Sequence, residues 1–208
     1  MFNPHSCALI VEGGAMRGIF ASGVLDAFVE SHHYPFDFVM GVSAGATNLV
    51  SYLSEQPRRS HHIITELACS SDFLDPLRFV KGGDLVDVSW LWRTSRYRFP
   101  LDLDTFSACR IPFYAVTTEV ATGAAVYLPV CPDNMDEVLT ATCALPVVQH
   151  ETPCVEGRPM ADGGISDSIP VIEAYRRGAR RMTVVLSEPR GYRKKPARFC
   201  WKIGRAHV

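Results

Sequence analysis

The sequence predicts an α/β fold with a mainly parallel central sheet and helices on both faces. A short, continuously apolar run is typical of a buried parallel strand and occurs at 7–11, and two further mainly apolar segments, 36–40 and 182–186, are also read as strands. Apolar residues at helical spacing follow the first two runs, at 19–30 and 44–53. The order strand, helix, strand, helix favours a doubly wound sheet.

The remaining elements are read from the same signals. Residues 57–70 are consistent with a helix, and Thr122-Gly123 joins two strands into a hairpin over 113–130. Asp133-Asn134 can cap a helix that Pro146 ends, and Pro170 suits the first position of a helix that Gly178 closes.

Length and charge predict one domain with a distinct tail. The chain has 208 residues, 47% of them hydrophobic and 21% charged, which is ordinary for one globular domain. The formal net charge of −1 divides into −8 over 1–189 and +7 over 190–208. We expect the folded domain to span 6–189 and 190–208 to be a truncated or non-native C-terminus. A solvated basic end is favoured over a contact with membrane or nucleic acid, so no nucleic-acid partner is predicted.

Cysteine usage and hydropathy predict a cytoplasmic protein. No Cys-x-x-Cys pair occurs, no signal peptide is recognised at the N-terminus, and no apolar run approaches the ~18 residues of a membrane span. Peripheral contact with the inner face of a membrane stays open. No metal or cofactor is expected, because no ligand cluster has the usual spacing. The cysteines are Cys7, Cys69, Cys109, Cys131, Cys143, Cys154 and Cys200.

A serine stands at the turn between the second strand and its helix. Gly41-Val42-Ser43-Ala44-Gly45 fits the Gly-x-Ser-x-Gly nucleophile elbow, in which the serine occupies a sharp turn at the strand end. The flanking Gly41 and Gly45 permit close approach of strand and helix. Taken alone the motif is weak, because small-residue turns produce it by chance.

A glycine-rich loop, Gly13-Gly14-Ala15-Met16-Arg17-Gly18, follows the first strand. A dinucleotide site would need glycine where Ala15 stands, and a P-loop would need Lys-Ser/Thr where Ile19-Phe20 stands. An oxyanion hole fits best, because its backbone donors would face a serine at the next strand end.

The base that would activate Ser43 is predicted to be an aspartate. None of the seven histidines follows a late strand as a catalytic triad would require, and His150 is kept only in reserve. Asp162 ends a short apolar run, and Gly163-Gly164 after it clear space for an open site. Alone, Asp-Gly-Gly would be read as an ordinary turn.

Together the three motifs resemble the patatin-like phospholipases, most closely the bacterial YjjU-like branch. The resemblance covers Ala8 to about Pro170 and includes the block Ala141-Thr142-Cys143-Ala144-Leu145-Pro146. It implies a patatin-like three-layer fold and a histidine-free dyad, with Ser43 as nucleophile and Asp162 as proton acceptor. It also implies an oxyanion hole from Gly13, Gly14 and Ala15, steadied by Arg17 and Gly18.

Two departures from the family pattern are visible. Glu12 stands where the family has aspartate, and Ala15 where it has glycine. A left-handed backbone at Ala15 would cost about 1 kcal/mol, which we expect the fold to tolerate.

The resemblance implies a serine lipid acyl hydrolase, a phospholipase or esterase acting on phospholipid or another acyl-ester lipid through an acyl-enzyme. The alternatives are an acyltransferase with the same dyad and a catalytically silent lipid- or protein-binding module. The aromatic and basic residues over 90–98 could meet a lipid interface, although a cap over the core is favoured.

Overall fold

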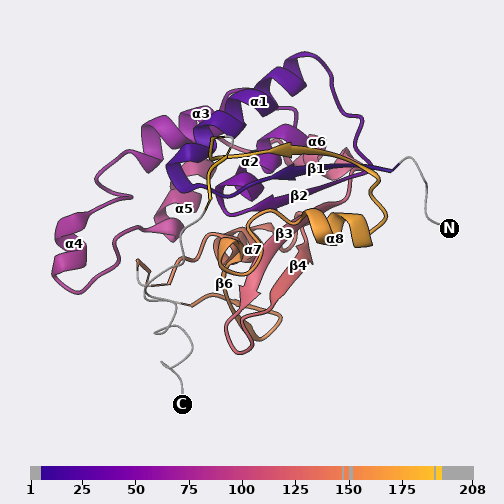
Figure 1. Ribbon diagram of the computed structural model, residues 1–208. Coiled ribbons are helices and arrows are strands. Elements are labelled where there is room, and N and C mark those ends of the chain that lie inside the picture. The colour runs from indigo at the N-terminus through magenta and orange to yellow at the C-terminus, as the bar shows by residue number, and fades with distance from the viewer. Residues whose placement is uncertain (1–5, 147, 150–151, 190, 194–208) are drawn as a thin grey trace.

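The computed structural model describes residues 6–146, 148–149, 152–189 and 191–193. These residues form one sheet with helices packed on it (Figure 1). The strands are β1 (Cys7–Val11), β2 (Phe38–Val42), β3 (Phe113–Glu119), β4 (Ala125–Pro129), β5 (Cys154–Val155), β6 (Arg158–Asp162) and β7 (Arg181–Val185). The tail beyond 193 and the reserve candidate His150 lie outside the described residues.

Most helices belong to the first two thirds of the chain. The helices are α1 (Gly18–Glu30), α2 (Ala44–Leu53), α3 (Arg59–His62), α4 (Pro76–Val80), α5 (Val88–Arg98), α6 (Leu103–Ala108), α7 (Met135–Thr142) and α8 (Val171–Arg176). Two 3-10 turns, η1 (Ala15–Arg17) and η3 (Gly163–Ile165), and a π-helix, η2 (Ile63–Ala68), complete the elements. The helix predicted over 57–70 is therefore α3 continued by a π-helix.

The sheet has a parallel centre and an antiparallel edge. The strand β1 pairs in parallel with β2 and β7, and β2 pairs in parallel with β3. The strands β4 and β6 pair antiparallel with β3, and β5 pairs antiparallel with β6. The α/β class with a parallel core is thus confirmed, and the hairpin predicted over 113–130 is the β3–β4 pair.

Alternate residues of the central strands enter two cores, as the period of two along a strand requires. Leu9, Val11 and Val39 face the larger core, to which α1, α2, α6 and α7 contribute. Ile10 and Met40 face a smaller core beneath α8, on the other side of the sheet (Figure 1). Helices on both faces complete the three layers that the resemblance implied.

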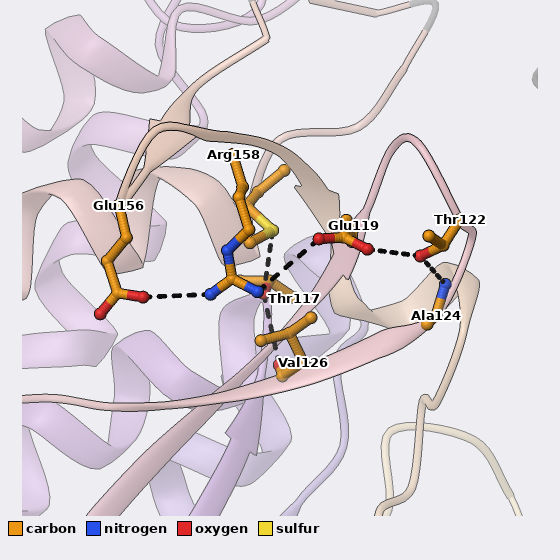
Figure 2. Close-up of polar contacts among 8 residues, drawn as sticks. Thr117, Glu119, Thr122, Ala124, Val126, Glu156 and Arg158 are labelled. Carbon is orange, nitrogen blue, oxygen red and sulfur yellow. Dashed lines mark hydrogen bonds and ion pairs between the residues drawn. The ribbon is translucent and has the colours of Figure 1, made fainter.

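Surface contacts hold the β3–β4 turn against the start of β6 (Figure 2). Arg158 pairs with Glu119 at 3.6 Å and with Glu156 at 3.0 Å, and the Thr122 hydroxyl donates to Glu119 at 2.6 Å. Arg158 is 41% exposed, and pairs at such positions contribute under about 1 kcal/mol each. They join the end of β3 and its turn to the start of β6, the strand that carries Asp162.

In the part of the chain that the structure describes, no helix combines the length and the apolar character needed to cross a membrane.

Candidate active site

Ser43 occupies a strained turn between β2 and α2. Its backbone has φ 51° and ψ −125°, a region that non-glycine residues adopt only when the surroundings impose it. A Cβ on Gly41 would lie 2.5 Å from the Ala46 Cα, and one on Gly45 would lie 2.4 Å from the Val11 carbonyl oxygen. Both predicted elbow glycines are therefore required by close backbone contact.

The Ser43 backbone is anchored from β3 through α7. Its N–H donates to Thr142 Oγ1 at 3.0 Å, and the Thr142 hydroxyl donates to the Val116 carbonyl at 2.5 Å. All three groups are buried, so the anchor holds the strained turn without competition from water. This contact also occupies the Ser43 N–H, which leaves oxyanion binding to other donors.

The glycine-rich loop lies directly against the serine. A Cβ on Gly13 would lie 3.1 Å from the Ser43 Cβ. Among the described residues, no acceptor receives a hydrogen bond from the N–H of Gly13, Gly14 or Ala15. Three donors without protein partners beside a serine are what an oxyanion hole needs.

Ala15 adopts the left-handed conformation considered from the sequence. Its φ is 48°, so the fold accepts alanine where the family pattern has glycine, at a cost of about 1 kcal/mol. The resulting turn places Ala15 at the wall of a pocket shared with Ser43.

The segment after β7 holds the outer side of this loop. The Glu12 carboxylate accepts from the Ser187 N–H at 2.6 Å, and the Ser187 hydroxyl donates to the Gly13 carbonyl at 2.8 Å. Arg17 pairs with Glu188 at 3.0 Å. Glutamate in place of aspartate at position 12 therefore has a specific partner.

Gly18 begins α1 where that helix meets α2. Its carbonyl accepts from the Asn48 side-chain amide at 2.7 Å, and a Cβ on Gly18 would lie 3.0 Å from the Ala44 Cβ. Gly18 therefore allows close contact between the two helices that begin at the site.

Asp162 reaches the serine because β2 and β6 share one edge of β3. Val42 pairs with Val116, and Asp162 pairs with Thr117, the next residue along β3. The strand β4 overlaps both pairings and so takes the other edge of β3. The carboxyl ends of β2 and β6 therefore point toward each other, and Ser43 and Asp162 meet there.

The Asp162 carboxylate is buried and oriented by its own turn. Asp162 is 3% exposed, and its Oδ1 accepts from the Gly164 N–H at 2.7 Å. A Cβ on Gly163 would lie 2.2 Å from the Val116 carbonyl oxygen, so β3 admits only glycine here. The Asp-Gly-Gly turn thus fixes the carboxylate beside the elbow.

Sequence reasoning missed the roles of Thr142 and Cys143. Burial first, and then the charge of Asp162, raises the pKa of the Cys143 thiol far above the ordinary value, while a hydrogen bond with Ser43 acts in the opposite direction. The thiol stays neutral and lines the pocket. The Ala-Thr-Cys-Ala-Leu-Pro block was the available signal, but a sequence gives no distance from it to Ser43.

An apolar pocket of about 280 Å³ opens at Ser43 and Ala15. Ile63, Ile64 and Ala68 of the π-helix form part of its wall, and π-helical turns often occur at functional sites. Trp92 of α5 also lines the pocket, in agreement with the cap favoured for the aromatic segment. No histidine is among its lining residues within the described part of the chain.

Comparison with known proteins identifies the family. The family model for patatin-like phospholipases matches residues 9–175. The chain belongs to this family. This patatin-like chain is 39% identical over 193 residues to the uncharacterized protein YjjU of Escherichia coli (strain K12), covering 90% of the chain and 54% of YjjU.

A solved structure shares the fold. VipD from Legionella pneumophila superposes with a TM-score of 0.56 at 16% identity, over 88% of this chain and 50% of VipD. At that identity the likeness concerns the fold. The patatin-like chain spans about half the length of both proteins.

Proposed function

We propose that this chain is a serine acyl hydrolase of lipids that uses Ser43 and Asp162 through an acyl-enzyme. The observation that supports the proposal is the strand register, which brings Ser43 and Asp162 to neighbouring strand ends at one edge of β3, with Ser43 in the lining of an apolar pocket. Membership of the patatin-like phospholipase family supports a phospholipid or another acyl-ester lipid as substrate.

In the first half-reaction Asp162 takes the hydroxyl proton as Ser43 Oγ attacks the ester carbonyl carbon. The developing oxyanion accepts hydrogen bonds from the N–H groups of Gly13, Gly14 and Ala15, for which the described structure records no protein acceptor. When the carbon–oxygen bond breaks, Asp162 returns the proton to the leaving alcohol, and the acyl group stays on Ser43.

Water completes the second half-reaction. Asp162 takes a proton from the water as it attacks the acyl carbonyl, and the same donors hold the second oxyanion. Collapse releases the fatty acid and returns the proton to Ser43 Oγ. An acyltransferase would replace this water by an alcohol, so product analysis with and without an acceptor alcohol separates the two activities.

Covalent labelling tests the nucleophile. A fluorophosphonate probe should label the wild type and the Ser107→Ala control, whose serine is exposed on α6, and should not label Ser43→Ala. Hydrolysis of a short-chain acyl ester should fall roughly 10⁴- to 10⁶-fold in Ser43→Ala and roughly 10³- to 10⁴-fold in Asp162→Asn. Wild-type activity in Ser43→Ala would refute the assignment, and a wild type that binds lipid without turnover would favour the silent binding module.

A further inference from the structure

The pocket wall also contains a charged and a polar residue away from Ser43 in the sequence. Arg59 and Ser60, at the start of α3, line it together with residues beside Ser43. Arg59 is 8% exposed, and burial lowers its pKa to about 10. A cation therefore stands in the wall of a pocket that is otherwise mostly apolar.

The Arg59 guanidinium is only partly satisfied by the protein. Its Nε donates to the Phe99 carbonyl at 3.0 Å, and its Nη1 donates to Ser51 Oγ at 3.2 Å. A guanidinium has five N–H donors, so three remain. Among the described residues no carboxylate pairs with Arg59, and none lines the pocket.

A second donor in the same pocket has no partner. The Trp92 indole Nε1 is buried and makes no hydrogen bond within the described structure. Buried donors are normally satisfied, and leaving one unmade costs about 1–3 kcal/mol. In addition to Arg59, the pocket wall thus includes a residue whose buried donor is unsatisfied in the described structure.

The distance from Ser43 limits what that acceptor can be. Thr47 and Asn48 of α2 line the pocket between Ser43 and Ser51, the residue to which Arg59 is bonded. Ser51 lies eight residues after Ser43, about 12 Å along the helix axis at 1.5 Å per residue. An extended acyl chain of medium length, esterified at Ser43, spans this interval.

We propose that Arg59 is a specificity-determining residue that binds a carboxylate at the far end of the substrate's acyl chain. The substrate class is then an ester of a medium-length dicarboxylic acid, with apolar methylenes along Ile63 and Ile64 and the free carboxylate on Arg59. A carboxylate pairs with a guanidinium through two parallel hydrogen bonds, which matches the donors left over. The inference rests on the proposed esterase function for the direction in which the acyl chain lies.

A head-group phosphate is the other anion that could meet Arg59. The glycerol backbone is too short to place a phosphate so far from the ester that Ser43 attacks. The two sources are separated by comparing chain-end carboxylates on a neutral alcohol with lysophospholipids whose acyl chains end in a methyl group.

The kinetic test uses p-nitrophenyl monoesters of glutaric, suberic and sebacic acids against monocarboxylic esters of equal length. For each chain length, kcat/KM for the dicarboxylic monoester is divided by kcat/KM for the monocarboxylic ester. In the wild type this ratio should rise from glutarate to suberate. Arg59→Met should lower the suberate ratio about ten- to a hundredfold, the range expected for hydrogen bonds to a charged group. Arg59→Lys should retain part of the ratio, and Arg58→Met, which removes a neighbouring exposed charge, should leave it unchanged.

The binding test does not depend on turnover. Ser43→Ala protein is titrated calorimetrically with monomethyl suberate and with methyl octanoate, and the same pair is measured on Ser43→Ala/Arg59→Met. The suberate should bind at least tenfold more tightly only where Arg59 is present. Binding preference without hydrolysis in the wild type would refute the proposed function and keep the Arg59 site.

Three results would overturn the inference. One is a wild type that prefers the monocarboxylic ester at every length. This result does not depend on the folding of any variant. Another is an Arg59→Met protein that loses activity equally on both ester series, which would assign Arg59 a purely structural role. The last is a preference for lysophospholipid that Arg59→Met abolishes while the suberate ratio stays unchanged, which would assign the site to the phosphate.

Discussion

At the scale of single residues, Thr142 decides whether the strained serine is held in place. One hydroxyl accepts from the Ser43 N–H and donates to the Val116 carbonyl, so it satisfies two buried backbone groups. The sequence indicated Ser43, Asp162 and the glycine loop because each lies in a short local motif. Thr142 acts across 99 residues, and no local pattern expresses that contact.

Replacing Thr142 tests this anchor. Thr142→Val keeps the shape and leaves both backbone groups unpaired, which should cost about 2–4 kcal/mol in the free energy of unfolding and lower kcat, because the strained turn relaxes. Thr142→Ser should retain most of both quantities. Urea unfolding and ester hydrolysis measure them, with Thr140→Val as a control on the same helix. Equal effects of Thr142→Val and Thr140→Val would contradict the anchor.

At the scale of elements, the strands were more readable from the sequence than the segment between α2 and β3. The run 7–11 is continuous and apolar, so its strand character follows from composition, and the strand predicted over 36–40 forms two residues later, at 38–42. The helices α3 to α6 are short and interrupted, and their boundaries depend on caps such as Asp75, which accepts from the Leu77 and Arg78 N–H groups. These helices lie over the pocket because of tertiary packing, and that packing leaves no periodic pattern in the sequence.

The helix α4 is the element that we expect to contact a lipid surface. It projects from the body of the molecule (Figure 1), with Leu77 and Val80 exposed by 70% and 83%. Nearby Leu74 and Leu85 line the pocket, so lipid held at α4 would be close to Ser43. The helix α4 is held by Arg78, whose side chain donates to the carbonyls of Asp72 and Phe73 before the helix and of Asp84 after it.

The double variant Leu77→Asp/Val80→Asp should weaken co-sedimentation with phosphatidylcholine vesicles by about tenfold or more, because burying such side chains contributes about 1.5–3 kcal/mol each. Hydrolysis of a water-soluble ester should stay unchanged. Ile172→Asp, at a site 65% exposed on α8, is the matched control. Loss of vesicle binding in the control as well would contradict a specific role for α4.

At the scale of the whole molecule, the site exists because of topology that the sequence did not reveal. The parallel order of β1 and β2 was predictable, and it brings the glycine loop beside Ser43. The pairing of β6 with the same edge of β3 that binds β2 was not predictable. It depends on β4, which occupies the other edge of β3. The local setting of Asp162 and the family resemblance both pointed to it as the base for Ser43, but neither gave the strand arrangement that brings the two positions together.

The stability of the whole domain should fall at alkaline pH through a tyrosine pair that packs the segment after α1 against α2. Tyr34 stacks on Tyr52 with ring centroids 4.9 Å apart. Burial, aided by the charge of Glu55, raises the pKa of Tyr34 to about 12, and burial raises that of Tyr52 further. The unfolded chain loses these protons near pH 10, so the free energy of unfolding should decrease as pH rises from about 10 through 12.

Tyr34→Phe separates this effect from packing. The Tyr34 hydroxyl is buried without a hydrogen-bond partner in the described structure, so its removal at neutral pH should be neutral or stabilising by up to about 1 kcal/mol. The alkaline decrease should become shallower at the same time. Tyr52→Phe removes a hydroxyl that donates to the His33 carbonyl at 2.7 Å, so it should cost about 1 kcal/mol at neutral pH. Urea unfolding at pH 7 and above pH 10 measures both variants, and an unchanged alkaline slope in Tyr34→Phe would show that other groups govern the loss.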